Sequence, residues 1–305
     1  MKKEFYSNGK LLITGEYLVL DGAKALALPT KFGQNLIVEK GENKEIKWTS
    51  YDADGSIWLD LQLSFEDISG KTIFEESESV KNTLIEILHQ GYLLNPDFIG
   101  NSEGYHITTQ LTFPRNWGLG TSSTLINNVA QWLEIDAFVL LNNSFGGSGY
   151  DIACAQNDCP ILYHLDSGKP VVEKVTFDPE FTENLYFVYL EKKQSSKSAI
   201  ASYYNNKNSH LADDIVANNI ITQEVLNSKK LHQFALALEE HEAAMSTILE
   251  LQTIKESLFP DFGGVIKSLG AWGGDFVLAI SKENPIKYFR KKGFKTIIPY
   301  KDMIL

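Results

Sequence analysis

The feature that most constrains the fold is a glycine-rich loop at residues 114–123, which reads Pro-Arg-Asn-Trp-Gly-Leu-Gly-Thr-Ser-Ser. The run at 106–113 predicts a strand that ends at Pro114, and the run at 124–141 predicts a helix. Glycine lets the backbone approach a ligand closely, and the first turn of a helix presents N–H groups without intrahelical partners. A strand, a glycine turn and a helix in this order predict an anion site suited to a phosphate chain.

The hydroxyls that follow the glycines allow two interpretations. Thr121, Ser122 and Ser123 could bind phosphate oxygens or a magnesium ion. The same residue types also cap helices, so an ordinary helix start after a tight turn explains them equally well. Both interpretations stay open from the loop alone.

Competing phosphate motifs fail on their spacing. The run Gly118-x-Gly120-x-x-Ser123 departs from the dinucleotide fingerprint at its last position, and it does not open a βαβ unit. Gly70-Lys71-Thr72 resembles the end of a Walker A loop, but Phe65 stands where that loop needs its first glycine. The sequence therefore excludes both of these nucleotide folds.

A second glycine loop, residues 146–149, precedes Asp151 and a short helix pattern that extends to residue 156. A carboxylate at a helix start keeps its charge because the helix dipole favours it there. Such a group could accept a proton from a substrate hydroxyl. The alternative is an aspartate that only caps the helix.

Lys10 enters an apolar run, where an unpaired cation is unfavourable. It therefore needs a carboxylate partner, for which Asp151 is the candidate, or a bound phosphate. Residues 10–20 predict a strand, a Gly-Glu turn and a second strand. Glu16 lies in this turn, where hydrogen bonding to backbone groups would be a structural role.

A third glycine cluster, Gly270-Ala271-Trp272-Gly273-Gly274, precedes the strand predicted at 276–280. Glycines just before a strand permit close approach of the backbone to a ligand or to another loop. The pattern of strands and helices restarts near residue 180, which indicates a domain boundary close to that point.

Composition excludes several classes of partner. The net charge of −11 disfavours nucleic acid and anionic membranes, and the apolar runs are too short to span a bilayer. The polar N-terminus is not a signal peptide, and Cys154 and Cys159 lack the spacing of a zinc site. We therefore expect a cytoplasmic monomer or homodimer with neither nucleic acid nor membrane as partner.

An anionic substrate would need a local concentration of cations on so acidic a chain. The stretch at 191–198 is the densest mixture of lysines and hydroxyls in the sequence. It is either a substrate-binding loop or a solvated surface loop.

Taken together and in order, these features resemble the GHMP kinases, over nearly the whole chain. Residues 10–22 resemble the first motif of that superfamily, and residues 114–123 resemble its P-x-x-x-G-L-G-S-S phosphate loop. Residues 269–274 resemble the third motif, G-A-G-G-G, with Trp272 in place of a glycine. Residues 149–153, Gly-Tyr-Asp-Ile-Ala, mark a subgroup.

The resemblance implies an α/β (α+β) fold with two domains. Residues 1–178 would form a β-rich N-terminal domain that holds the phosphate loop, and residues 179–305 would form a ferredoxin-like C-terminal domain. It also implies ATP and Mg²⁺ as cofactors and a small anionic molecule as substrate.

Details within the motifs lean toward the phosphomevalonate kinases: Gly15-Glu16-Tyr17, the run Gly-Ser-Gly-Tyr-Asp at 147–151, and Gly274-Asp275. The implied reaction is transfer of the ATP γ-phosphoryl group to phosphomevalonate. A mevalonate kinase, with a hydroxyl acceptor, and a catalytically inactive binding protein with the same fold are the alternatives.

The resemblance also implies roles for individual residues. Asp151 would be the catalytic base, Lys10 would interact electrostatically with the substrate and the phosphates, and Ser122 would coordinate magnesium. The nucleotide-binding residues are expected to be Pro114, Gly118, Leu119, Gly120, Thr121, Ser122 and Ser123. The substrate-binding residues are expected to be Glu16, Ser148, Gly149, Lys193, Ser196, Lys197, Gly270, Ala271 and Gly273.

This sequence departs from the family pattern at two positions. Leu140 stands where mevalonate kinases carry a second magnesium carboxylate, so the metal is expected to be held by Ser122, ATP oxygens and waters. Trp272 narrows a loop that is normally bare backbone, which puts ATP affinity in question.

Overall fold

The computed structural model describes residues 2–192, 203–204, 210–270, 272 and 274–305. The chain forms two compact units, each built from separate stretches of sequence. The first unit contains residues 1–9, 32–115 and 119–156, and the second contains residues 10–31, 116–118 and 157–305, as far as they are described. Strands β1 (Lys3–Leu12) and β2 (Ala25–Lys40) run from one unit into the other.

In the first unit, the strands form a mixed sheet in the order β4-β3-β5-β2. Strand β3 (Glu45–Tyr51) runs antiparallel to β4 (Ile57–Ser64) and parallel to β5 (Gly104–Leu111), and β5 pairs antiparallel with β2. Beyond β2, the sheet continues with β6 (Ile161–Asp166) and β7 (Lys169–Lys174), to a total of seven strands with β1.

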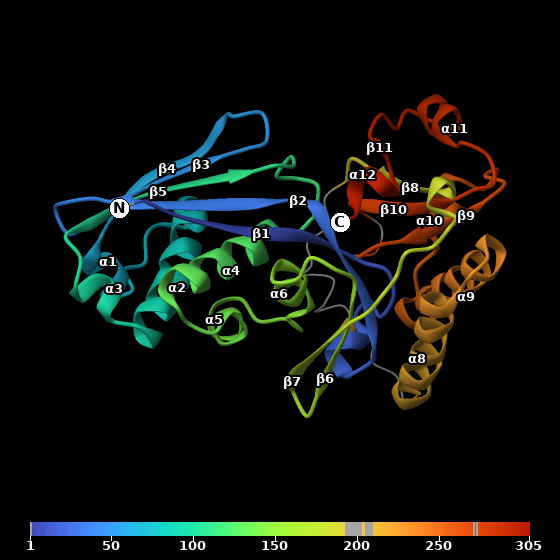
Figure 1. The fold of residues 1–305 in the computed structure, drawn as a ribbon, viewed down its shortest axis with the longest axis horizontal. Helices are drawn as coiled ribbons and strands as arrows, with labels where there is room; N and C mark the ends of the chain where they lie inside the picture. Colours follow the sequence, from blue (N-terminus) through green and yellow to red (C-terminus); the bar gives the residue numbers. More distant parts are fainter. Residues whose placement is uncertain (1, 193–202, 205–209, 271, 273) are drawn as a thin grey trace. The chain divides into compact units, whose positions relative to one another are not determined.

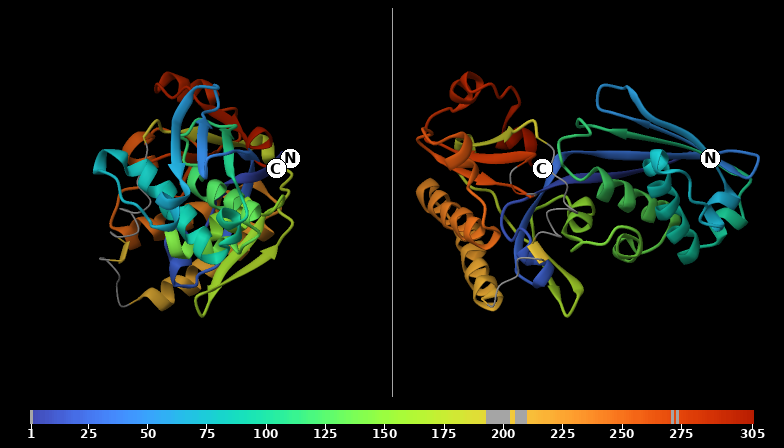
Figure 2. Two further views of the ribbon diagram at one scale, coloured as in Figure 1. Left: turned by 90° about the vertical axis from the view of Figure 1, so that its left-hand side faces the viewer. Right: turned by 180° about the vertical axis from the view of Figure 1, so that it is seen from behind.

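Helices cover one face of the sheet in the first unit, as two opposite views show (Figures 1 and 2). Their inward side chains form one apolar core with the strands, which includes Trp48, Leu88, Val129 and Leu140. The helices are α1 (Phe65–Ser69), α2 (Ser79–Leu94), α3 (Asp97–Gly100), α4 (Thr121–Leu133), α5 (Ala137–Ser144) and α6 (Tyr150–Ala155), with the 3₁₀ turn η2 (Glu76–Glu78).

The second unit contains an antiparallel sheet in the order β11-β8-β10-β9. Its strands are β8 (Leu185–Tyr189), β9 (Val265–Ser268), β10 (Phe276–Ile280) and β11 (Ile297–Pro299). Numbered from the first of these, the order is 4-1-3-2, with helices between the first and second and between the third and fourth strands. This is the ferredoxin-like arrangement, and it confirms the predicted fold.

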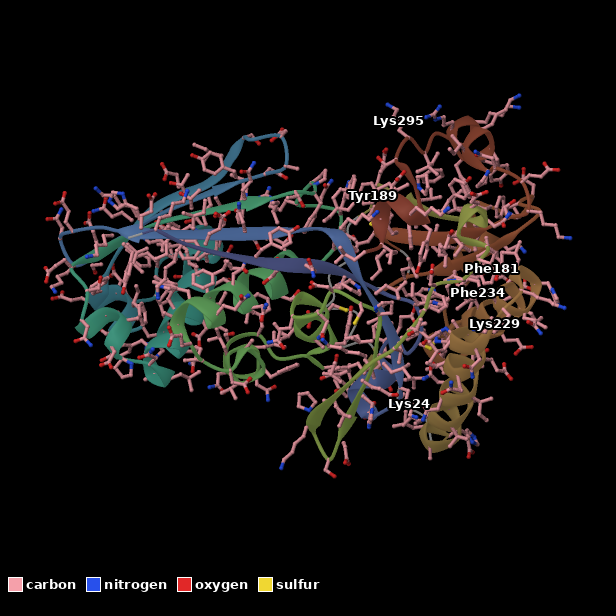
Figure 3. All side chains as sticks on the ribbon, viewed as in Figure 1. Lys24, Phe181, Tyr189, Lys229, Phe234 and Lys295 are labelled. Atoms are coloured by element: carbon pink, nitrogen blue, oxygen red, sulfur yellow. The ribbon has the colours of Figure 1, made fainter. Side chains whose placement is uncertain are left out.

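The helices of the second unit include a long pair, α8 (Leu211–Asn227) and α9 (Leu231–Leu249), which pack on each other. The ring of Phe234 on α9 packs against the Phe181 ring at an interplanar angle of 45°, with the ring centroids 5.2 Å apart (Figure 3). The shorter helices are α10 (Ile254–Leu258), α11 (Ile286–Lys291), α12 (Tyr300–Met303) and the 3₁₀ turns η1 (Leu18–Asp21) and η3 (Thr182–Asn184).

Two predicted elements were wrong in detail. The second strand expected within 10–20 is the 3₁₀ turn η1, which buries Leu18 and Val19. The single helix expected at 124–141 is two helices, because Glu134 takes a left-handed backbone conformation at φ 56°. Asp136 then starts α5 by accepting hydrogen bonds from the N–H groups of Phe138 and Val139.

None of the helices in the described residues is both long enough and apolar enough to cross a membrane.

Candidate active site

Helix α4 in the first unit begins directly after the glycine loop. The N-cap residue before it is Gly120, which adopts φ 98°, a left-handed conformation that favours glycine. In the described part of the chain, no side chain caps this helix end. The N–H groups of the first turn are therefore available to an anion, as the phosphate interpretation requires and as a side-chain cap would prevent.

The hydroxyls of this first turn divide into bound and exposed groups. Ser123 Oγ donates to the carbonyl oxygen of Gly120 at 2.9 Å, and both Ser123 and Thr124 are buried. Ser122 is exposed, and Thr121 is partly exposed. Ser122 is therefore the best placed of these hydroxyls to reach a ligand from solvent, and Ser123 serves the loop backbone instead.

Buried amides and hydroxyls attach α4 to the strands of the first unit. Thr124 Oγ1 donates to Gln34 Oε1 on β2 at 2.7 Å. Ser7 Oγ on β1 donates to Asn128 Oδ1 at 2.7 Å, and Asn127 Nδ2 donates to Ser7 Oγ at 2.8 Å. A buried polar network fixes one arrangement of the groups it joins, because each unmade bond would cost about 1–3 kcal/mol. These contacts hold the start of α4 in place.

The first half of the glycine loop belongs to the second unit, where Lys10 and Asp275 contact Gly118. Lys10 Nζ donates to the carbonyl oxygen of Gly118 at 2.9 Å. On the other side, a Cβ atom placed on Gly118 would lie 2.1 Å from Asp275 Oδ2. A side chain at position 118 would therefore require Asp275 to move, and the φ of 70° favours glycine as well.

Aromatic side chains anchor the same part of the loop to β8 and β10. The Trp117 ring meets Phe276 edge-on, with centroids 5.4 Å apart, and lies 6.3 Å from the Tyr189 ring. Tyr189, labelled in Figure 3, donates its hydroxyl to the carbonyl oxygen of Asn116 at 3.0 Å. The packing of Trp117 against these two rings thus holds the backbone just before Gly118 in place.

Asp151 lies in the first turn of α6 and is partly exposed. The N-cap residue of the helix is Gly149, with φ 87°, and Asp151 Oδ1 accepts a hydrogen bond from the N–H of Ile152 at 3.1 Å. Asp151 is therefore not the capping residue of this helix, which weakens the purely structural interpretation. Ser148 and Gly149, predicted to bind substrate, precede it and are buried.

Glu16, predicted to bind substrate, is 1% exposed and forms an ion pair with Lys267 at 2.5 Å. Burial raises its pKa to about 7, although the nearby ammonium lowers it. The geometry supports a structural role for this carboxylate. Sequence reasoning missed Lys267; the available signal was a lysine inside the short apolar strand β9.

The third glycine loop is described only in part, because Ala271 and Gly273 lie outside the described residues. Gly270 has φ 63° and open space around the position of a Cβ atom. Trp272 is 5% exposed and packs with Tyr17, Leu18, Ala23, Tyr203 and Met245. Its indole is therefore part of a core cluster.

The other residues singled out from the sequence lie outside the described residues or differ in their exposure. Lys193, Ser196 and Lys197 lie outside the described residues. Pro114 is partly exposed at the start of the loop, and Leu119 is fully buried. Leu140, noted above as a departure from the mevalonate kinase pattern, is fully buried in the core of the first unit.

The donor groups present fit a magnesium ion bound mainly through a nucleotide. Among the described residues, no group of three or more His, Cys, Asp or Glu side chains could hold a metal ion. Mg²⁺ typically keeps several waters and takes few protein ligands beside phosphate oxygens. The exposed hydroxyl of Ser122 at the start of α4 suits that mode of binding.

Comparison with known proteins gives matches at the level of structure. No protein-family model matches the sequence, and no curated protein matches it. The fold is similar to a Lin0012 protein from Listeria innocua, at 16% identity and a TM-score of 0.73, covering 98% of this chain and 97% of that one.

The fold is also similar to two solved structures of proteins that are named as kinases. Mevalonate kinase from Methanococcus jannaschii is 17% identical with a TM-score of 0.70, covering 98% of this chain and 97% of that one. Phosphomevalonate kinase from Streptococcus pneumoniae, solved in complex with phosphomevalonate and AMPPNP, is 17% identical with a TM-score of 0.71. That match covers 97% of this chain and 99% of the other.

Both sheets, their strand orders and matches over nearly full chain lengths agree with the expectation from the motifs. The chain has the two-domain fold of the GHMP kinases.

Proposed function

We propose that this protein is an ATP-dependent small-molecule kinase. The observation that carries the proposal is the start of α4, where Gly120 leaves the first-turn N–H groups without a side-chain cap and Ser122 exposed. This is an anion site in the loop whose sequence resembles the kinase phosphate loop. Kinases among the structurally similar proteins support the proposal.

Bound ATP with Mg²⁺ would supply the γ-phosphoryl group and neutralise part of its charge. The loop backbone and the hydroxyls of Thr121 and Ser122 would hold the phosphate chain. Lys10, fixed on the Gly118 carbonyl, would add positive charge beside the loop. Asp151 would accept the proton of an acceptor hydroxyl, or orient an acceptor phosphate, because it is partly exposed and is not the helix cap.

We propose phosphomevalonate as the acceptor. The support is the set of motif details at Gly15–Tyr17, at 147–151 and at Gly274–Asp275, together with the similarity to a phosphomevalonate kinase. Substrate contacts are proposed for Ser148, Gly149 and Gly270, and for the Lys193–Lys197 segment. Mevalonate is the second candidate acceptor, favoured by the equally similar mevalonate kinase.

The experiment that tests the proposal is a turnover assay with ATP, Mg²⁺ and a panel of acceptors: phosphomevalonate, mevalonate, homoserine and galactose. We expect ADP release that depends on phosphomevalonate. Turnover with mevalonate alone would move the assignment to the second candidate. ATP binding without turnover of any acceptor would indicate a non-catalytic binding protein, and the absence of ATP binding would contradict the proposal as a whole.

A further inference from the structure

A fully buried ammonium group lies in the second unit, at the end of β9. Lys267 is 0% exposed, and its Nζ lies 2.5 Å from Glu16 Oε1 and 3.5 Å from Glu242 Oε2. It also donates to the carbonyl oxygen of its neighbour Ser268. Burying a charge costs several kcal/mol unless partners surround it, so this arrangement demands both carboxylates.

The partners of Lys267 connect three segments that are far apart in sequence. Glu242, on α9, accepts hydrogen bonds from the N–H and Oγ of Ser268, at 2.9 and 2.7 Å. His241, beside it, accepts from the N–H of Gly15 at Nε2, at 3.0 Å, and this Nε2 lies 3.4 Å from Glu16 Oε2. The turn that follows β1 is thus bound to α9 and β9 at consecutive residues.

A second link lies directly beside the first. The hydroxyl of Tyr17 accepts a hydrogen bond from the N–H of Trp272 at 3.1 Å, and Tyr17 holds a strained φ of 58°. Lys267 Nζ lies 5.7 Å from the centre of the Trp272 ring. The residues at 15–17 are therefore joined to the third glycine loop on one side and to α9 on the other.

The two segments joined by the network meet again at Gly118. Followed backward along the chain, the turn leads through β1 to Lys10, which donates to the Gly118 carbonyl oxygen at 2.9 Å. Followed forward, β9 leads through the glycine loop to Asp275, whose carboxylate lies against Gly118. Both segments therefore contact Gly118.

Stability alone does not explain a buried ion pair, because well-packed apolar residues of similar volume often serve as well or better. We propose that Lys267 and Glu16 are positioning residues: their ion pair fixes the Gly15–Tyr17 turn to the loop after β9, so that Lys10 and Asp275 hold Gly118 in one place. The consequence for catalysis rests on the proposed kinase function.

The test is the double variant Glu16→Gln/Lys267→Met, which removes both charges of the ion pair and leaves the Glu242 carboxylate hydrogen-bonded to the N–H and Oγ of Ser268. We expect it to melt within a few degrees of the wild type. We expect its kcat to fall at least tenfold, with a smaller change in the KM for ATP. The amides of Gly15 and Trp272, which are hydrogen-bonded across the link, should exchange with solvent faster.

The matched control is Glu239→Gln/Lys255→Met. It removes an exposed ion pair of 3.4 Å between α9 and α10 with the same change in charge, and it should alter neither readout. If the double variant at Glu16 and Lys267 does not fold, the near-isosteric single variant Glu16→Gln takes its place. We expect it to lower kcat and to speed hydrogen exchange at Gly15 and Trp272 as well. Unchanged kcat and unchanged exchange at Gly15 and Trp272 in a folded variant would overturn the inference. A wild type inactive with every acceptor would remove the kinase proposal, and the exchange data would then decide the positioning role alone.

Discussion

At the scale of single residues, Asp151 is the group on which the proposed chemistry depends most. Asparagine keeps its shape and its hydrogen bond from the Ile152 N–H but cannot take a proton. We expect Asp151→Asn to lower kcat by about 100-fold or more while ATP binding is unchanged. Steady-state kinetics and nucleotide titration measure the two effects. Asp166→Asn, at the exposed end of β6, is the control, and near-normal turnover of Asp151→Asn would remove Asp151 from the mechanism.

Glu16 makes a prediction about stability and pH. Its pKa is raised by burial to about 7 from the ordinary 4.5, and it faces Lys267 on β9 and Glu242 and His241 on α9. Between these values, the folded state binds a proton that the unfolded state has lost, so this group makes the protein less stable as pH rises from about 4.5 to 7. Above pH 7, this decrease in the free energy of unfolding is complete and no longer changes with pH; it amounts to a value on the order of 3 kcal/mol.

Glu16→Gln cannot ionise, so its stability relative to the wild type should improve as pH rises through that window and level off above pH 7. The pKa of His241 is lowered well below its ordinary value by burial, so this residue makes the protein less stable as pH falls below about 6.5. Because His241 Nε2 lies 3.4 Å from Glu16 Oε2, the substitution can change this contribution, but above pH 6.5 it is absent from both proteins and the difference reports Glu16 alone. Thermal unfolding at pH 5, 6, 7 and 8 measures the difference, and a pH-independent difference would contradict the assigned pKa.

At the scale of elements, the glycine loop predicts an effect on nucleotide binding. Valine at position 120 would place a branched side chain at φ 98° beside the uncapped start of α4. We expect Gly120→Val to abolish the rise in melting temperature that ATP with Mg²⁺ gives the wild type. Differential scanning fluorimetry with a nucleotide titration measures this.

The control for backbone strain is Gly293→Val, because Gly293 has φ 99° and open space around it. Both variants should lose stability from the left-handed conformation, about 1–2 kcal/mol each. Only Gly120→Val should lose the response to ATP. Equal responses of the two variants to ATP would show that the loop is an ordinary helix start.

Elements with a clear period and clear boundaries could be predicted from the sequence. The alternation at 57–63 gave β4, and the spacing of Leu84, Ile87 and Leu88 gave α2, because exposure to water on one side imposes these periods. Short buried segments carry no period. For that reason Leu18–Asp21 was predicted as a strand, and the break at Glu134 was missed.

The candidate site was predictable where backbone conformation demands glycine, as at Gly118 and Gly120. It was not predictable where residues distant in sequence share a buried charge. Nothing local indicates that Lys267 pairs with Glu16, since their contact depends on how β9 and the turn after β1 come together in the folded unit. The expected alternatives for Lys10 did not include its observed acceptor, the Gly118 carbonyl, for the same reason.

At the scale of the whole molecule, the net charge of −11 bears on how an acceptor that carries a phosphate could bind. An acceptor phosphate brings roughly two negative charges near neutral pH, and the overall field of the protein repels it. Binding therefore requires local cations beyond Lys10, for which we propose Lys193 and Lys197. Neutralising both, as Lys193→Gln/Lys197→Gln, should raise the KM for phosphomevalonate far more than the KM for ATP. Each lost charge-assisted hydrogen bond should cost about 1.5–3 kcal/mol.

A change of two charges alters the general field as well as any contact, so the control must carry the same change elsewhere. Lys287→Gln/Lys291→Gln provides it, because both lysines are exposed on α11. A general field effect is screened by salt and would appear in both variants. A contact effect would appear only at 193 and 197 and would spare mevalonate, which lacks the phosphate. Steady-state kinetics with both acceptors at two salt concentrations separates these cases.

Equal KM values for phosphomevalonate in the wild type and the Lys193→Gln/Lys197→Gln variant would remove this segment from substrate binding. Turnover of mevalonate alone by the wild type would make mevalonate the acceptor.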